Sequence, residues 1–199
     1  MSLRQSIFTP PTRLPLTLSD AKEHLRLLSD DSDQRVLDCI RAARDYVESS
    51  TGRSLITTTH RLTGDMFAFW LNRYQPIEIP KTPVQSVVFK YYDSFNAQQT
   101  FTSYEIYRYG DLNVLLRPLW NTAWPDIYRR ADAVQIDYVA GYGDDHSAVP
   151  GLVKQILRLL VGHFFEQRDA VIVGTIQGEM SFGIKALIGQ LRRGDFVCA

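Results

Sequence analysis

The sequence predicts an α+β fold in which a small α-helical bundle is interrupted by a β-rich insertion at about residues 54–140. Apolar residues recur at helical spacing before and after this stretch. Within it, β-branched and aromatic residues dominate and turn signals separate short runs. We therefore expect helices near 18–28, 32–51, 150–168 and 184–193, with the strands between the second and third helices.

The composition is that of an ordinary globular protein. The chain has 199 residues, of which 45% are hydrophobic and 22% are charged, so it can bury a substantial core. Its 22 basic and 22 acidic residues balance, which disfavours a sequence-specific DNA-binding protein that acts alone. Cys39 and Cys198 form no disulfide framework, which favours a reduced, intracellular setting. We predict no signal peptide and no membrane-spanning segment.

The N-terminal third should contain an arm and two helices. Residues 1–16 carry three prolines and no periodicity, which predicts an extended N-terminal arm. Thr17 is expected to cap the first helix. The second helix should begin in the acidic run SDDSD, with Asp31 and Gln34 as a capping box, and should end at Gly52.

A single domain is expected over residues 17–169, with the β-rich insertion at 54–140 inside it. Alternation of apolar with polar residues from Val134 to Tyr138 indicates a strand with one solvated face. After Pro150 the helical spacing returns. Because two apolar stripes in one small domain require each other, we expect the third helix to pack on the second. The residues expected to meet are Ile156, Leu160 and Phe164 with Val36, Ile40 and Val47.

Residues 170–199 are apolar but interrupted by glycines, which predicts a flexible arm rather than one rigid helix. Such a segment suits an arm that becomes ordered on a neighbouring subunit or on another protein. The alternative, in which it folds back on its own core, stays open. The suspected assembly-interface residues are Val171, Ile172, Val173, Ile176, Phe182, Ile184, Leu187, Ile188 and Leu191.

No motif predicts catalysis, a cofactor or a metal site. The run YVAGYGDDHSAVP at 138–150 lacks the lysine of a phosphate-binding P-loop and the third glycine of a dinucleotide site. We interpret it as a turn from the last strand into a helix. The four histidines show no zinc-site spacing, and no serine lies in a nucleophile elbow. The acidic run lacks the glycine and glutamate of a calcium loop, since Val36 and Ala42 occupy those positions.

Aromatic residues of the β region allow two interpretations. Large rings dominate core burial, so a β-sheet core explains them without a ligand. A surface that stacks sugars or bases, or a protein interface, is the alternative. The residues concerned are Tyr91, Tyr92, Tyr104, Tyr107, Tyr109, Trp120 and Trp124.

Several motifs together resemble the head–tail connector (adaptor) proteins of long-tailed phages, prophages and gene transfer agents. These motifs are A-A-R-x-Y-V-E-x-x-T-G-R at 42–53, P-V-Q-S-V at 83–87, and A-G-Y-G…V-P…K-Q-I…L-V-x-H-x-x-E-x-R from 140 to 168. The resemblance covers most of residues 14–170. No single motif is diagnostic, but their order and spacing are fairly specific.

The resemblance implies a structural protein without catalytic activity. Such adaptors assemble as a ring, dodecameric in the virion, beneath the portal protein, and they contact the next neck or tail-completion protein. It implies that DNA passes through the central channel without specific binding. It also implies a location in the virion neck after assembly in the bacterial cytoplasm. The alternatives are a ligand-binding or hydrolytic domain that uses the aromatic β region, and another neck or tail-completion protein.

Overall fold

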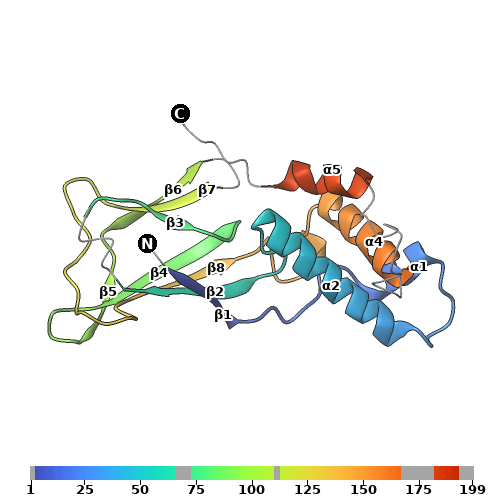
Figure 1. Cartoon of the computed structure of the whole chain (residues 1–199), viewed down its shortest axis with the longest axis horizontal. Coiled ribbons are helices and arrows are strands. Elements are labelled where there is room, and N and C mark those ends of the chain that lie inside the picture. Colours follow the sequence, from blue (N-terminus) through green and yellow to red (C-terminus); the bar gives the residue numbers. More distant parts are fainter. Residues whose placement is uncertain (1–2, 66–72, 110–112, 167–181, 193–199) are drawn as a thin grey trace, which may run out of the picture. The chain divides into compact units, whose positions relative to one another are not determined.

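The structure, a computed structural model, describes residues 3–65, 73–109, 113–166 and 182–192. The chain forms two compact units, each built from separated parts of the sequence (Figure 1). The β unit combines Met1–Pro11 with Thr57–Gly141, and the helical unit combines Thr12–Ile56 with Tyr142–Ala199. The α+β class that the sequence predicts is confirmed.

Four α-helices and one 3₁₀ turn make up the described part of the helical unit. They are α1 (Leu18–Leu25), α2 (Asp33–Thr51), η1 (His146–Ala148), α4 (Gly151–Glu166) and α5 (Phe182–Leu191). Helix α2 packs against α4, and both contact α1 and α5. Within the described ranges, no helix combines the length and the apolar character needed to cross a membrane.

The predicted contact between the second and third helices is confirmed. Both helices turn an apolar face into the same core, in which these side chains are fully or almost fully buried. The buried members of the predicted set are Val36, Ile40, Val47, Ile156 and Leu160. Phe164 is only partly buried, and it packs against the edge of this core.

The two ends of α1 and the beginning of α2 can be compared with the predicted capping residues. Thr17 caps α1 as predicted, since its Oγ1 accepts the Asp20 N–H at 3.0 Å. Helix α1 ends before the predicted residue 28 because Arg26 adopts a left-handed conformation, with φ 57°. The capping box at Asp31 is wrong: α2 begins after Ser32, and the Gln34 amide donates to another carboxylate of α2.

The acidic run before α2 pairs with a lysine instead. Lys22 Nζ lies 2.5 Å from Asp30 Oδ1 and 2.7 Å from Asp33 Oδ1. The hydrogen bond from Lys22 lowers the pKa of Asp30, and the same contacts raise the pKa of Lys22. A cation from the preceding helix therefore binds two carboxylates of the acidic run in which α2 begins.

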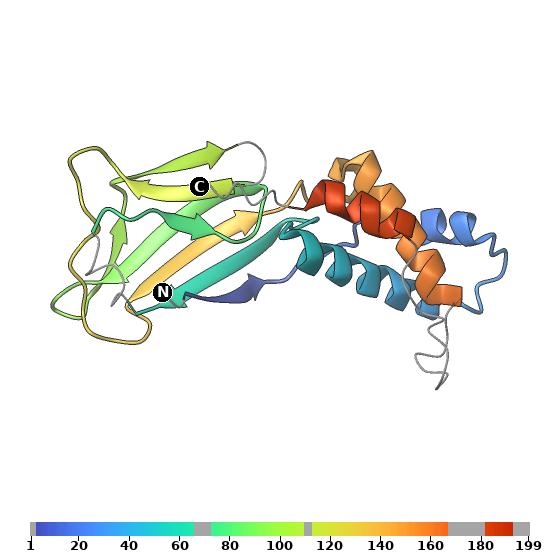
Figure 2. The ribbon, with the colours of Figure 1, turned by 45° about the horizontal axis from the view of Figure 1, so that its top comes forward.

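The described part of the β unit is a two-layer sandwich of antiparallel sheets. Its strands are β1 (Arg4–Thr9), β2 (Thr58–Gly64), β3 (Ile77–Ile79), β4 (Val84–Tyr92), β5 (Gln98–Phe101), β6 (Tyr104–Tyr109), β7 (Asn113–Pro118) and β8 (Val134–Ala140). The larger sheet has the order β1-β2-β8-β4-β5, and the smaller has the order β3-β7-β6. Figure 2 shows the smaller sheet lying over one face of the larger.

Buried rings fill the space between the two sheets. Phe89 of β4 stacks on Trp124 with ring centroids 5.2 Å apart, and Phe101 and Tyr104 pack beside them. The Trp124 indole N–H donates to the Gln75 carbonyl at 2.9 Å, so this buried polar group is satisfied. The aromatic cluster therefore forms much of the core of the sandwich.

The N-terminal segment differs from the predicted arm. Residues 4–9 form β1, which pairs antiparallel with β2 so that Arg4 lies opposite Thr63 and Ile7 lies opposite His60. All six residues of β1 are exposed. The prolines at 10 and 11 follow the strand rather than prevent it, and an edge strand needs a partner on one side only.

His60 is a buried base in the larger sheet. Its side chain is 4% exposed, its ring stacks on Tyr138 at 5.2 Å, and its Nδ1 lies 3.2 Å from the Gln5 amide nitrogen. Burial, with a smaller contribution from the charge of Lys81, lowers the pKa of His60 to about 4. The imidazole is therefore neutral in the folded protein at neutral pH.

Leu160→Ala should lower the free energy of unfolding by about 2–5 kcal/mol, because it leaves a cavity in the core of the helical unit. Leu152→Ala on the same helix is the matched control: Leu152 is exposed, and its replacement should cost no more than about 0.5 kcal/mol. Urea unfolding measures both. Equal, small losses would show that this face of α4 is not the core.

The neutral state of His60 predicts a dependence of stability on pH. The unfolded histidine titrates near its ordinary pKa of about 6.5 and the folded one near 4, so the unfolded state binds more protons between these values. Stability should therefore fall as the pH falls through this window. His60→Gln should lose less stability than the wild type between about pH 7 and about pH 5. The exposed His24→Gln should behave as the wild type in urea titrations at both pH values.

Candidate functional site

The glycine-rich run after β8 is a structural turn. Gly141 has φ 144°, which is strained for any residue with a side chain, and its N–H donates to the Pro83 carbonyl at 2.9 Å. The Gln85 amide donates to the Gly141 carbonyl at 2.9 Å. A Cβ at Gly143 would lie 2.6 Å from Cβ of Ala148. Both glycines are therefore required by the path of the backbone.

Asp145 serves the same turn. Its carboxylate binds Arg13 Nη1 at 2.5 Å and also contacts His146. Partial burial acts to raise the pKa of Asp145, but the charges of His146 and Arg13 and the N–H groups of His146 and Ser147 outweigh it and lower the pKa. The carboxylate is thus engaged by residues of its own chain.

The described residues contain no group of three or more His, Cys, Asp or Glu side chains placed to hold a metal ion. Cys39 lies in the core of the helical unit, and burial raises the pKa of its thiol. A raised pKa disfavours the thiolate, which is the nucleophilic form. Cys39 is therefore a packing residue of the core.

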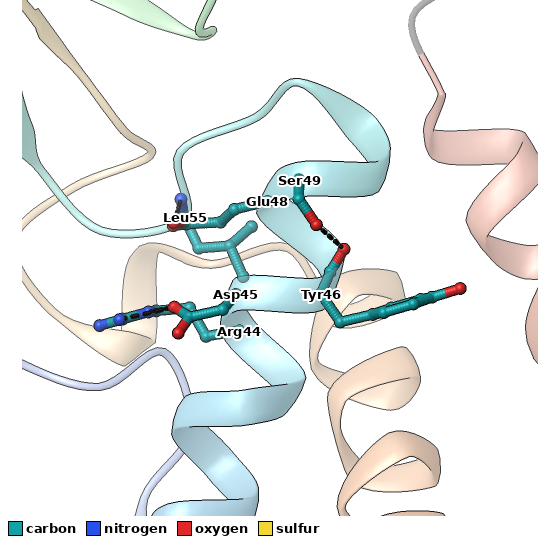
Figure 3. Close-up of polar contacts among 6 residues, drawn as sticks. All are labelled: Arg44, Asp45, Tyr46, Glu48, Ser49 and Leu55. Carbon is teal, nitrogen blue, oxygen red and sulfur yellow. Dashed lines mark hydrogen bonds and ion pairs between the residues drawn. The ribbon is translucent and has the colours of Figure 1, made fainter. Parts of the chain in front are cut away.

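The motif at 42–53 forms the last turns of α2, and its side chains also bind the backbone that follows the helix (Figure 3). Glu48 Oε1 accepts the Leu55 N–H at 2.8 Å, and Ser49 Oγ donates to the Tyr46 carbonyl at 3.0 Å. Figure 3 shows the side chains of Arg44 and Tyr46 extending to opposite sides of the helix. Within the motif, Glu48 thus holds the following backbone, and Tyr46 lies exposed at the surface.

The end of the motif is a helix stop. Thr51 Oγ1 donates to the Val47 carbonyl at 2.7 Å and accepts the Arg53 N–H at 3.3 Å. Gly52 ends α2 in the left-handed conformation, with φ 70°. Thr51 and Gly52 thus turn the backbone so that the side chain of Arg53 enters the helical unit.

Arg53 joins three parts of the helical unit. Its side chain is buried, its Nε donates to the Leu191 carbonyl at 3.1 Å, and its Nη1 donates to the Tyr142 hydroxyl. The guanidinium suits the end of α5, because the last carbonyls of a helix lack partners and carry partial negative charge. Sequence reasoning missed this role, although the arginine directly after a Thr-Gly helix stop was the available signal.

The nine suspected interface residues lie in different environments. Ile184, Ile188 and Leu191 are buried in the core of their own helical unit, and Leu187 is partly buried against it. Phe182 is the first residue of α5. The remaining four lie outside the described residues: Val171, Ile172, Val173 and Ile176.

Residues 182–191 confirm the helix predicted near 184–193, and they follow the alternative in which this part of the segment folds back on its own core. They form one helix packed on α2 and α4. The glycines within this stretch do not prevent the helix, since three apolar residues spaced by four and three share a single face. An interface role for the nine residues stays a prediction.

The aromatic residues of the β unit are divided between core and surface. Tyr104 and Trp124 contribute to the core, as expected. Tyr107 and Tyr109 are exposed on β6 and stack on each other at 5.9 Å, and Trp120 is 97% exposed. For the three tyrosines of β6, alternation explains the difference, because Tyr107 and Tyr109 share one face of the sheet and Tyr104 lies on the other.

The two hydrogen bonds that the Arg53 side chain donates can be tested without disturbing the end of α2. Arg53→Met keeps much of the side-chain length but leaves the Leu191 carbonyl and the Tyr142 hydroxyl without their donor. It should cost about 2–3 kcal/mol of stability in urea unfolding. Arg41→Met on the exposed side of α2 is the control and should change stability by no more than about 0.5 kcal/mol. Equal losses of stability in Arg53→Met and Arg41→Met would contradict a stabilising role for the Arg53 hydrogen bonds.

Comparison with solved structures finds the same fold in chains of gene transfer agent particles. One chain from "Neck of empty GTA particle computed with C6 symmetry" has a TM-score of 0.77 and 24% identity, covering 100% of this chain and 99% of that chain. A second, from "Virion of native gene transfer agent (GTA) particle", has a TM-score of 0.75 and 23% identity, covering 98% of both chains. A third, from "Neck of native GTA particle computed with C12 symmetry", has a TM-score of 0.74 and 23% identity, covering 100% and 99%.

Sequence comparison points the same way for the first half of the chain. No curated protein sequence matches it. A protein-family model does match, and the matched residues include the motifs at 42–53 and 83–87. The matching model is that of the phage gp6-like head-tail connector protein family, and it matches residues 15–111 of this chain.

Proposed function

We propose that this protein is a structural connector subunit whose copies form a ring in the neck of a tailed phage, a prophage or a gene transfer agent. The observation that carries the proposal is the likeness in fold, over essentially the whole length of both chains, to chains of neck structures with sixfold and twelvefold symmetry. The connector family match over 15–111 supports it independently. Its place is therefore the virion, at the junction of head and tail.

The charge distribution suits a channel that lets DNA slide. Each phosphate that a protein cation neutralises adds salt-dependent affinity, so a channel should offer few free cations. The chain has no net charge. Many of its basic side chains are also bound to carboxylates of the same chain. These are Arg13, Lys22, Arg41, Arg44, Arg61, Arg73, Lys90 and Arg130.

We propose three protein partners and no cofactor. The partners are further copies of the chain, the portal protein on one side and the next neck or tail-completion protein on the other. DNA passes through the ring without specific binding, and the subunit catalyses no reaction. The structural roles of Gly141, Gly143 and Asp145 support this assignment, because they account for these residues of the run at 138–150 without a ligand.

The purified protein, alone and mixed with its cognate portal protein, should form a symmetric ring. Mass by light scattering and class averages by electron microscopy measure this. The ring, or a monomer that enters a ring only on the portal, is the expected result. A monomer that ignores the portal and binds a sugar or nucleotide saturably would contradict it. In that case Trp120→Ala and Tyr107→Ala, which alter the exposed aromatic residues, should abolish the binding.

A further inference from the structure

Within the described ranges, no strand pairs with the outer edge of β1 in the larger sheet. The strand order places β1 at the end of the sheet, with β2 as its partner among the described strands. Edge strands of monomeric proteins are usually short, charged or interrupted by proline. Strand β5 at the opposite end follows this rule, with four residues that begin Gln-Gln-Thr. Strand β1 has six exposed residues, and its only charge is at its first residue, Arg4.

The open edge carries apolar side chains on both faces. Ile7 lies opposite His60, whose side chain is buried, so Ile7 continues the inner face of the sandwich, yet it is 61% exposed. On the other face Phe8 is 57% exposed, with the Arg61 guanidinium 4.0 Å from its ring centroid. These side chains would lose water contact if another strand paired with β1.

A cavity lies beside the same edge. It has a volume of about 300 Å³ and is lined by Leu3, Gln5, Leu62, Glu78 and Pro80. Its lining comes from the β1 and β2 side of the larger sheet and from the β3 side of the smaller one. The sandwich is therefore open where a further strand would lie along β1.

We infer that β1 accepts an extended segment of the neighbouring copy in the ring, and that this segment is the apolar run Val171–Ile176. The inference rests on the proposed function. The run, V-I-V-G-T-I, has no charge and no proline, and four of its six residues are Val or Ile. Such a sequence favours strand pairing, with backbone hydrogen bonds for affinity and alternate side chains for specificity.

Length and stoichiometry support a second copy as the donor. The run lies within residues 167–181, fifteen residues that follow α4 and precede α5 and lie outside the described residues. Six paired residues leave nine as tethers, at about 3.3 Å each when extended. Every copy offers one edge and one run, so each copy donates to the next, which is the head-to-tail contact that closes a ring.

Disulfide trapping tests this contact in the full chain. In a background with Cys39→Ala and Cys198→Ala, a chain carrying Ile7→Cys is mixed with a chain carrying Val173→Cys or Ile172→Cys. Because successive residues of a strand face opposite sides, one of the two mixtures should yield disulfide-linked dimers in at least about tenfold greater amount than the other. Phe95→Cys, at a 91% exposed position in the same unit, is the control and should yield none with either partner.

Three results would overturn the inference. The first is a disulfide that forms only within single chains carrying both cysteines, because the run would then pair with its own β1. The second is protection of β1 from hydrogen exchange only when portal or another neck protein is added, because the donor would then be that protein. The third is the absence of dimers in both mixtures while rings still form.

A charged substitution on β1 tests this inference separately from the proposed function. Ile7→Lys should reduce the fraction of protein in rings by about tenfold, because a lysine on the inner face opposes strand addition. Phe95→Lys should leave that fraction within about twofold of the wild type. Urea midpoints confirm that both variants are folded. If Ile7→Lys forms normal rings, the β1 contact is wrong and the connector function stands; if the wild type forms no ring with or without portal, both fail.

Discussion

The buried guanidinium of Arg53 is the constraint on which the helical unit depends. A charge in the interior is costly unless it is paired and hydrogen-bonded. Among the described residues no carboxylate pairs with it; a helix-terminal carbonyl and a tyrosine hydroxyl accept its N–H hydrogen bonds. The end of α2, the end of α5 and the segment after β8 must therefore arrive at one point. The left-handed Gly52 and the hydrogen bonds of Thr51 direct the arginine toward that point.

The motifs that carry the sequence resemblance have a common structural task. Glu48 holds the backbone at Leu55, and Gln85 holds it at Gly141. Both contacts lie next to positions where the chain leaves one unit for the other, at 56/57 and 141/142. Glu48 and Gln85 thus stabilise the backbone at two positions where the chain passes from one unit to the other. These motifs therefore account for the path of the backbone and leave the surfaces of the protein without a comparable signal.

The sequence predicted best what depends on local spacing. The stripe through Val36, Ile40 and Val47 requires only the helical period, and Thr17 requires only its neighbours. Prediction failed where a distant partner decides the outcome. Strand β1 forms because β2, more than fifty residues away, supplies its hydrogen bonds. The surface role of Trp120 and the docking of α5 likewise depend on which neighbouring faces are covered, and no local pattern records that.

The order of strands in the larger sheet also governs how the protein can be made. Strand β8, at residues 134–140, lies between β2 and β4, so the sheet stays incomplete until about two thirds of the chain has been synthesised. The helical unit forms later still during synthesis, because α2 packs mainly against α4, which is synthesised after β8. Long-range pairing of this kind is slow and leaves apolar surface open to aggregation. A nascent chain that stops before residue 134 lacks both the central strand of the larger sheet and helix α4, so it can complete neither unit.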